Sequence, residues 1–110
     1  MVGGRAERSR LGCVGAAAVL LAAAAPAHTT HRVQMKDVAF VPAEVVARVG
    51  DRIEWQNEDI VDHTATSEPA GFDVVVPSGR SRATVLERPG TFTYTCRYHP
   101  NMTGRIRVEG

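Results

Sequence analysis

The sequence predicts an all-β fold, a Greek-key β-sandwich of seven to eight strands, preceded by a segment that directs export. Short runs rich in Val, Ile, Thr, Phe and Tyr recur from Arg32 onward, and clusters of Gly, Pro, Ser and Asp separate them. No window after Arg32 shows sustained helical periodicity. Short strands at this regular spacing are typical of a sandwich with Greek-key connections.

The expected strands follow directly from these runs. They cover residues 32–38, 44–49, 52–56, 63–67, 72–76, 82–87, 92–96 and 105–109. Alternation is clearest in the seventh run, where successive side chains point to opposite faces of the sheet. Phe92, Tyr94 and Cys96 therefore share one face, which we expect to be the core face. Cys96 then lies at the core side of a strand, where the chain leaves the sheet.

The first 27 residues are predicted to be a secretory signal peptide, and residues 28–110 one small domain. A basic start precedes an apolar run from Leu11 to Ala25, and Ala25-Pro26-Ala27 matches a small-x-small cleavage pattern. The run is shorter than the roughly 20 apolar residues that span a bilayer. A retained membrane anchor is the alternative. Lipid attachment to Cys13 is disfavoured because this cysteine precedes most of the apolar run.

The net charge excludes one class of function, nucleic-acid binding. The formal charge is +1, and it becomes −1 when the three Arg and one Glu of the predicted signal peptide are removed. Such a dispersed, near-neutral charge does not form the basic patch that nucleic-acid binding requires.

The cysteine content is a second constraint. Cleavage also removes Cys13, which leaves Cys96 unpaired in a compartment that oxidises thiols. A solitary exported thiol is inert, nucleophilic or bound to a metal.

A short segment near the C-terminus carries the strongest chemical signal. Cys96, His99 and Met102 follow one another at intervals of three, with Pro100 favouring a turn over a helix. Thiolate and thioether are soft ligands and imidazole is borderline, a set that selects copper over calcium, magnesium or manganese. A fourth ligand has to come from elsewhere, and His63 is the best candidate, brought in by a strand of the opposite sheet.

The segment from Tyr94 to Met102, followed by a short final strand, closely resembles the C-terminal copper loop of cupredoxins, and its Cys-x-x-His-x-x-Met spacing is most like that of amicyanins. The resemblance spans residues 33–108 and also includes the segment from Trp55 to Thr64. It implies a type 1 copper ion, cycling between Cu(I) and Cu(II), held by His63, Cys96, His99 and an axial Met102. Two departures are Asp62, where amicyanin-like proteins often have Pro, and Thr64, where plastocyanin and azurin have Asn. The second leaves open which side chain tethers the two ligand loops.

A copper site with these four ligands predicts a carrier of single electrons and not an enzyme. Four protein ligands leave no open position for a substrate, and a trigonal site with a weak axial sulfur changes little between the two oxidation states. We expect the backbone N–H of Thr64 to donate to the Cys96 sulfur. The protein is expected to be a periplasmic or otherwise extracytoplasmic monomer that meets redox partner proteins.

The expected electron port is His99, in a loop near the surface. Tyr98, Pro100 and Met102 are the candidates for an apolar patch around it. Arg97 and Arg105 flank the loop, and either they attract an acidic partner or they are ordinary solvated side chains. The sequence supports the two interpretations equally.

Three other functions compete with electron transfer. The first is copper storage or delivery, in which His28 and His31 at the mature N-terminus bind Cu(II) loosely. The second is a structural zinc site, which accepts thiolate and imidazole but gains little from Met102. The third is a cysteine hydrolase with Cys96 as nucleophile, which requires a cleft and an orienting third group that so short a chain has little room to build.

Overall fold

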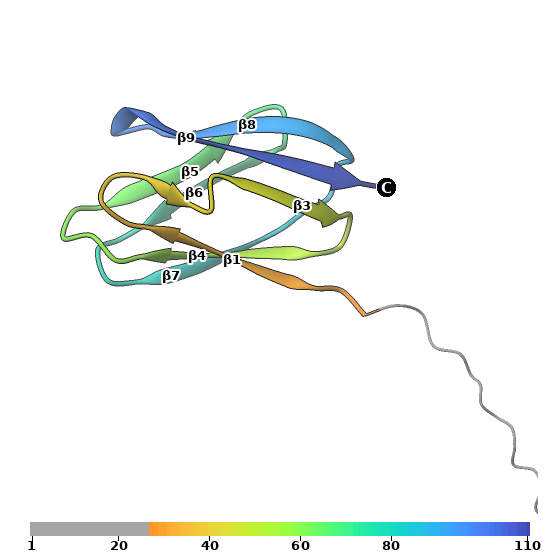
Figure 1. The fold of residues 1–110 in the computed structure, drawn as a ribbon, viewed down its shortest axis with the longest axis horizontal. Coiled ribbons are helices and arrows are strands. Elements are labelled where there is room, and N and C mark those ends of the chain that lie inside the picture. Colours follow the sequence, from red (N-terminus) through yellow and green to blue (C-terminus); the bar gives the residue numbers. More distant parts are fainter. Residues whose placement is uncertain (1–26) are drawn as a thin grey trace, which may run out of the picture.

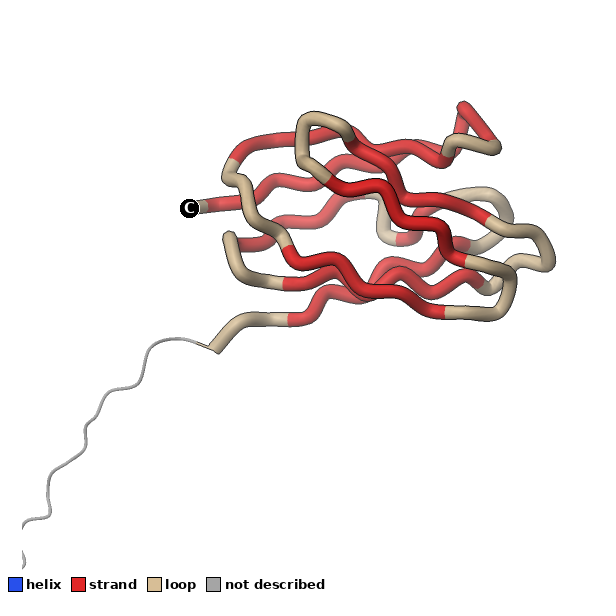
Figure 2. Tube along the Cα trace, turned by 180° about the vertical axis from the view of Figure 1, so that it is seen from behind, coloured by secondary structure: helices blue, strands red, loops and turns tan. Residues whose placement is uncertain are grey.

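The computed structural model describes residues 27–110, which form strands and no helix (Figure 2). There are nine strands: β1 (Thr30–Met35), β2 (Phe40–Val41), β3 (Glu44–Arg48), β4 (Arg52–Asn57), β5 (His63–Ser67), β6 (Phe72–Val76), β7 (Ser81–Val85), β8 (Gly90–Cys96) and β9 (His99–Glu109). The all-β prediction is confirmed. The predicted signal peptide falls almost wholly outside the described residues, as does Cys13. Within residues 27–110, the structure contains no helix long and apolar enough to cross a membrane.

The strands form two sheets that face one another (Figure 1). One sheet has the order β2-β1-β4-β7 and the other the order β3-β9-β8-β5-β6. Strands β1 and β4 run parallel, as do β3 and β9, while the remaining pairs are antiparallel. Consecutive strands such as β3 and β4 therefore lie in different sheets, which gives the crossover connections of a sandwich.

The core between the sheets is centred on aromatic side chains. Trp55 and Tyr94 are almost fully buried, and their ring centroids lie 5.2 Å apart in an edge-to-face arrangement. Phe40 packs edge-on against Tyr94 with centroids 4.7 Å apart. Such pairs stabilise a fold by about 0.5–1.5 kcal/mol each beyond the area they bury. As predicted, Tyr94 and Cys96 point inward from β8, whereas Phe92 is only half-buried at the margin of the core.

The first strand ends three residues earlier than the sequence predicts. Strand β1 stops at Met35 because Lys36 and Ala39 exchange backbone hydrogen bonds of 2.9 and 3.1 Å and close a tight hairpin to β2. The two central residues of that turn, Asp37 and Val38, have φ values of 54° and 57°. Positive φ at both positions matches the twist of a two-residue hairpin, although a β-branched residue rarely adopts it.

Strand β9 begins six residues earlier than predicted, at His99 instead of residue 105. Its first residue is paired with Cys96 of β8, and an irregularity in register lies between Thr95 and Cys96. The chain therefore turns back within the two residues Arg97 and Tyr98. As a result, most of the segment that carries the candidate ligands belongs to a β-hairpin and is held by the sheet.

Candidate metal centre

Two imidazoles and one thiol converge at the end of the sandwich where β4 joins β5 and β8 turns into β9. One ligand atom from each of His63, Cys96 and His99 lies within 4.8 Å of the others. The sulfur of Cys96 is 3.7 Å from His63 Nδ1 and 3.6 Å from His99 Nδ1. Among residues 27–110, these three side chains form a group that could hold a metal ion.

His63 reaches the sulfur from a neighbouring strand of the same sheet. It begins β5, which lies next to β8 in the order β3-β9-β8-β5-β6. The expectation that the opposite sheet supplies His63 is therefore wrong. A Greek-key connection carries the chain from β4 across to this sheet before His63, and sequence order alone does not say which sheet receives it. The His63 side chain is fully buried.

Cys96 and His99 lie opposite each other across the mouth of the hairpin. Cys96 is the last residue of β8 and is 1% exposed, whereas His99 opens β9 and is half-buried. The prediction that His99 lies outside the sheet is wrong, since it is paired with Cys96. The expectation that it lies near the surface is met, because Tyr98 beside it is 49% exposed.

Met102 lies three residues beyond His99 on the same strand. Its side chain is 1% exposed and shares the inward face of β9 with Ile106 and Val108. This placement brings it to the buried side of the hairpin that carries Cys96 and His99. Its role as an axial ligand stays a prediction.

The surroundings of Cys96 favour the thiolate, the form that binds metal. Burial raises the pKa of the thiol, but the Thr64 N–H, the His99 side chain, the Tyr98 N–H and the His63 side chain around the sulfur outweigh this effect and lower the pKa to about 6. A thiol normally titrates near pH 8.5, so this sulfur is prepared for ligation in neutral solution. The Thr64 N–H lies 3.3 Å from the sulfur, as the sequence led us to expect.

The tether between the two ligand segments, left open by the sequence, is the side chain of Thr64. Its hydroxyl oxygen accepts a hydrogen bond of 2.8 Å from the backbone N–H of Arg97. The same hydroxyl lies 3.0 Å from the hydroxyl of Thr66, which donates to Asp73 over 2.9 Å. A single buried residue next to one candidate ligand thus fixes the backbone beside another.

Sequence reasoning missed Asp59, which contacts His63 on the side away from the sulfur. His63 Nε2 donates to Asp59 Oδ2 over 2.8 Å. Such a carboxylate orients a metal-binding imidazole and makes it more basic. The only signal in the sequence is an acidic residue four positions before the candidate ligand, and Asp62 next to His63 was an equally plausible partner. Asp62 instead accepts a hydrogen bond of 2.9 Å from the N–H of Ser78.

Comparison with known proteins decides the family. The model of the cupredoxin-like domain matches residues 11–108. The chain belongs to the cupredoxin family. It is 32% identical over 91 residues to amicyanin-alpha of Methylorubrum extorquens, an alignment that covers 77% of this chain and 76% of that protein. The amicyanin of Paracoccus versutus is 23% identical over 83 residues, which cover 70% of this chain and 63% of the relative.

Solved cupredoxin structures share the fold. The Cu(I) form of a methionine-to-alanine variant of amicyanin aligns with a TM-score of 0.66 at 23% identity, covering 76% of this chain and 86% of that one. A purple cupredoxin from Nitrosopumilus maritimus aligns with a TM-score of 0.63 at 21% identity, covering 72% of this chain and 99% of that one. In this cupredoxin the thiolate and two imidazoles, with Met102 nearby in sequence, form a possible site for one copper ion.

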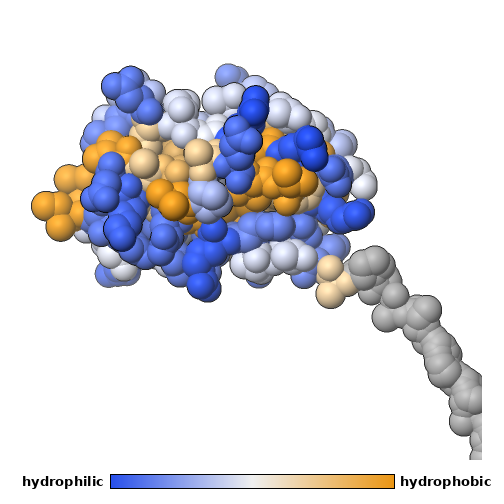
Figure 3. Space-filling view, in the orientation of Figure 1, coloured by the Kyte–Doolittle hydropathy of each residue, from blue (hydrophilic) through white to orange (hydrophobic). Residues whose placement is uncertain are grey.

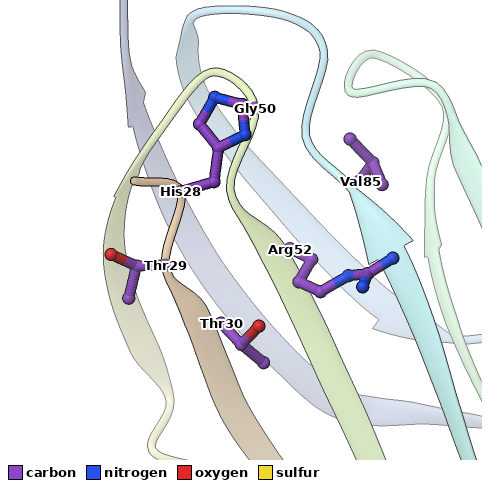
Figure 4. A pocket seen from close by; sticks show the side chains of 6 residues that line it. All are labelled: His28, Thr29, Thr30, Gly50, Arg52 and Val85. Carbon is purple, nitrogen blue, oxygen red and sulfur yellow. The ribbon is translucent and has the colours of Figure 1, made fainter. Parts of the chain in front are cut away.

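The two N-terminal histidines lie at the other end of the sandwich, where they contact different partners. The ring of His28 lies against Gly50 at the margin of a shallow cavity (Figure 4). His31 Nε2 donates to Asp51 Oδ2 over 2.9 Å. Asp51 is 4% exposed and also accepts the N–H of Thr29. His31 is thus engaged in holding β1 to the turn between β3 and β4.

The arginines that flank the candidate ligands are paired within the chain. Arg97 Nε donates to Asp73 Oδ1 over 3.2 Å, and its guanidinium carbon lies 5.8 Å from the centre of the Tyr98 ring. Arg105 donates to Glu44 over 3.0 Å. Exposed pairs of this kind contribute little stability, but they reduce the charge available to attract an acidic partner. The structure therefore favours the interpretation of both arginines as ordinary surface side chains.

Proposed function

We propose that this cupredoxin is an exported, mononuclear type 1 copper protein that carries single electrons between partner proteins. His63, Cys96 and His99 would supply the trigonal ligands and Met102 the weak axial one. The observation that carries the proposal is the buried thiol within 4.8 Å of two imidazole nitrogens, on strands that share one sheet. Bound copper would supply one-electron redox chemistry between Cu(I) and Cu(II).

The chain's own residues support a carrier whose site changes little during turnover. The Thr64 N–H and the convergent imidazoles surround the sulfur. A preorganised donor set keeps the reorganisation of the protein small when the charge at the site changes by one unit. Four protein ligands would leave no open position for a substrate, which favours a carrier over an enzyme.

Electrons would enter and leave at the end of the molecule that holds the hairpin between β8 and β9. His99 is half-buried there, and Tyr98 is 49% exposed. Ile60, in the loop between β4 and β5, is 94% exposed, and Figure 3 shows an apolar group protruding at that end of the molecule. Transient redox encounters use small interfaces, below about 1,200 Å², and an apolar rim around the port suits such an encounter.

Copper delivery is the rival function, and the structure offers it less support. A loose N-terminal site needs both His28 and His31, but His31 is bound to the buried Asp51. Rates of metal exchange separate the two functions. A carrier retains its copper through repeated cycles of oxidation and reduction, whereas a delivery protein loses it to an acceptor during the same period.

Optical and paramagnetic-resonance spectra of the copper-loaded protein test the proposal. We expect an intense visible band from thiolate-to-copper charge transfer, complete loss of that band in Cys96→Ser, and an unchanged band in the control Thr93→Val, which alters an exposed residue of β8. Metal analysis after expression with both copper and zinc tests the structural zinc alternative. Loading with zinc alone, or a band that survives Cys96→Ser, would contradict the proposal.

Export is tested separately. Mass spectrometry of the protein recovered from the periplasmic or culture fraction is expected to give an N-terminus near His28. Recovery of the full-length chain in the membrane fraction would support the retained anchor instead.

A further inference from the structure

The carboxylate of Asp59 joins the buried imidazole of His63 to the turn between β1 and β2. Its Oδ2 accepts from His63 Nε2 over 2.8 Å and from the Val38 N–H over 2.9 Å. Its Oδ1 accepts from the Asp37 N–H over 2.7 Å. Three donors from two separate segments thus point at one side chain, which is only 14% exposed.

We propose that Asp59 is a positioning residue for the metal centre: it fixes His63 with Nε2 protonated and Nδ1 free toward Cys96, and it thereby lowers the reduction potential of the metal held there. The effect on the potential rests on the proposed function, because it requires a redox-active ion. The effect on the imidazole does not, and it can be measured on the metal-free protein.

The tautomer follows from the chemistry of the two partners. An ionised carboxylate only accepts hydrogen bonds, so the nitrogen of His63 that faces Asp59 must carry the proton. In a neutral imidazole the other nitrogen then has a free lone pair. That nitrogen is Nδ1, which lies 3.7 Å from the Cys96 sulfur. Asp59 therefore presents the correct nitrogen to the site.

The two candidate histidine ligands differ in their hydrogen-bond partners, and this difference indicates how Asp59 affects the site. Within residues 27–110, His99 has no carboxylate partner, whereas His63 has one at 2.8 Å. A carboxylate behind an imidazole increases the electron density on the ligating nitrogen. A more electron-rich ligand favours the more highly charged oxidation state of a metal, here Cu(II) over Cu(I), and so lowers the potential.

The turn between β1 and β2 supplies two backbone N–H donors to the carboxylate in its buried position. Two consecutive N–H groups point at the carboxylate because Asp37 and Val38 both have positive φ, which forms a small anion-binding concavity. The unfavourable backbone of Val38 thus serves to hold Asp59 against His63.

The test compares Asp59→Asn with Asp62→Asn. Both variants remove one negative charge from the loop between β4 and β5, but Asp62 bonds to Ser78 and not to His63. For the copper-loaded proteins we expect Asp59→Asn to change the ratio of Cu(II) to Cu(I) affinity at least tenfold in favour of Cu(I), which corresponds to a rise of about 59 mV for a one-electron couple. Asp62→Asn should change the ratio less than threefold.

The second measurement uses metal-free protein labelled with ¹⁵N at histidine. In wild type and in Asp62→Asn, we expect His63 to be entirely the tautomer with the proton on Nε2, and in Asp59→Asn a mixture of the two tautomers. A proton on Nδ1 of His63 in the wild type would overturn the inference, even if Asp59→Asn failed to fold. Equal shifts of potential in the two variants would overturn it as well. If the wild type bound no copper, the proposed function would be wrong. The tautomer of His63 in the metal-free protein would still show whether Asp59 positions this imidazole.

Discussion

Thr64 contacts Cys96 through its backbone and the turn after Cys96 through its side chain. Its N–H lies 3.3 Å from the Cys96 sulfur, and its hydroxyl accepts the N–H of Arg97 over 2.8 Å. The two bonds can be separated by mutation, because the first survives any substitution that preserves the backbone and the second requires the hydroxyl.

We therefore expect Thr64→Val to destabilise the protein by about 1–2 kcal/mol, because the N–H of Arg97 loses its acceptor in a partly buried position. Urea unfolding measures this change. Hydrogen exchange of the Arg97 amide should become faster in the same variant. Thr93→Val, an exposed position on β8, is the control and should change neither quantity. Unaltered exchange at Arg97 would show that the hydroxyl does not hold this turn.

Gly104 leaves room for the ring of Tyr94. The two residues are paired across β8 and β9, and a Cβ at position 104 would collide with the Tyr94 ring. Because backbone and a buried ring cannot easily move apart, Gly104→Ala is expected to lower the free energy of unfolding by about 1–3 kcal/mol. Thr103→Ala, at the exposed neighbouring position, is the control. If Gly104→Ala lowered the free energy of unfolding in urea by less than Thr103→Ala does, the hairpin would accommodate the added methyl group without strain.

The hydroxyl of Tyr94 is buried and has no hydrogen-bond partner among the described residues. Burial also raises its pKa, so it stays a neutral phenol in the folded protein. A buried hydroxyl without a partner contributes a desolvation cost and little else. We expect Tyr94→Phe to be neutral or to stabilise the fold by up to about 1 kcal/mol in thermal unfolding. A clear loss of stability would reveal a partner, such as an ordered water molecule, for this group.

Asp51 makes the stability of the domain depend on pH. Burial raises its pKa, but the Thr29 N–H, which has the largest effect, and the bonds to His31 and Arg48 lower the pKa to about 2. The unfolded chain has the ordinary pKa of about 3.9, so the stabilisation is complete above about pH 5 and is lost as the pH falls from there to about 2. Its full size is about 2–3 kcal/mol.

Urea unfolding between pH 7 and pH 2 tests this linkage. Asp51→Asn should lower the stability at pH 7 and should flatten the decline between pH 5 and pH 2. Glu87→Gln, at an exposed position, is the control for charge removal. If Asp51→Asn retained the wild-type slope in that range, the carboxylate of Asp51 would not be the group responsible.

Val38 adopts a backbone conformation that suits glycine. Its φ is 57°, and its side chain is 45% exposed, so little packing is lost when it is shortened. We expect Val38→Gly to stabilise the protein by up to about 1 kcal/mol, since the left-handed region costs an L-residue about that much. The matched control is Val46→Gly at an exposed position on β3, which should destabilise. Differential scanning calorimetry of the two variants distinguishes relief of strain from a general effect of glycine.

Local sequence patterns predicted much of the sandwich and of the candidate donor set. Alternation and turn residues identified residues 63–67 and 72–76 as strands with the bounds observed, because both signals are local. The Cys-x-x-His-x-x-Met spacing is also local, and it named three side chains that a hairpin brings to one end of the fold. The short strand β2 and the early end of β1 were not visible, because Asp37 and Val38 lack the glycine or asparagine that usually marks such a turn.

The groups that surround those side chains became known only from the folded structure. It placed His63 on a strand next to Cys96 in the same sheet, and it made Thr64 the tether between the ligand segments. It also selected Asp59, and not Asp62, as the partner of His63. These contacts depend on the crossovers between the sheets and on the bend of individual loops. Local sequence patterns do not encode such distances, because they arise only when strands far apart in the chain pack together.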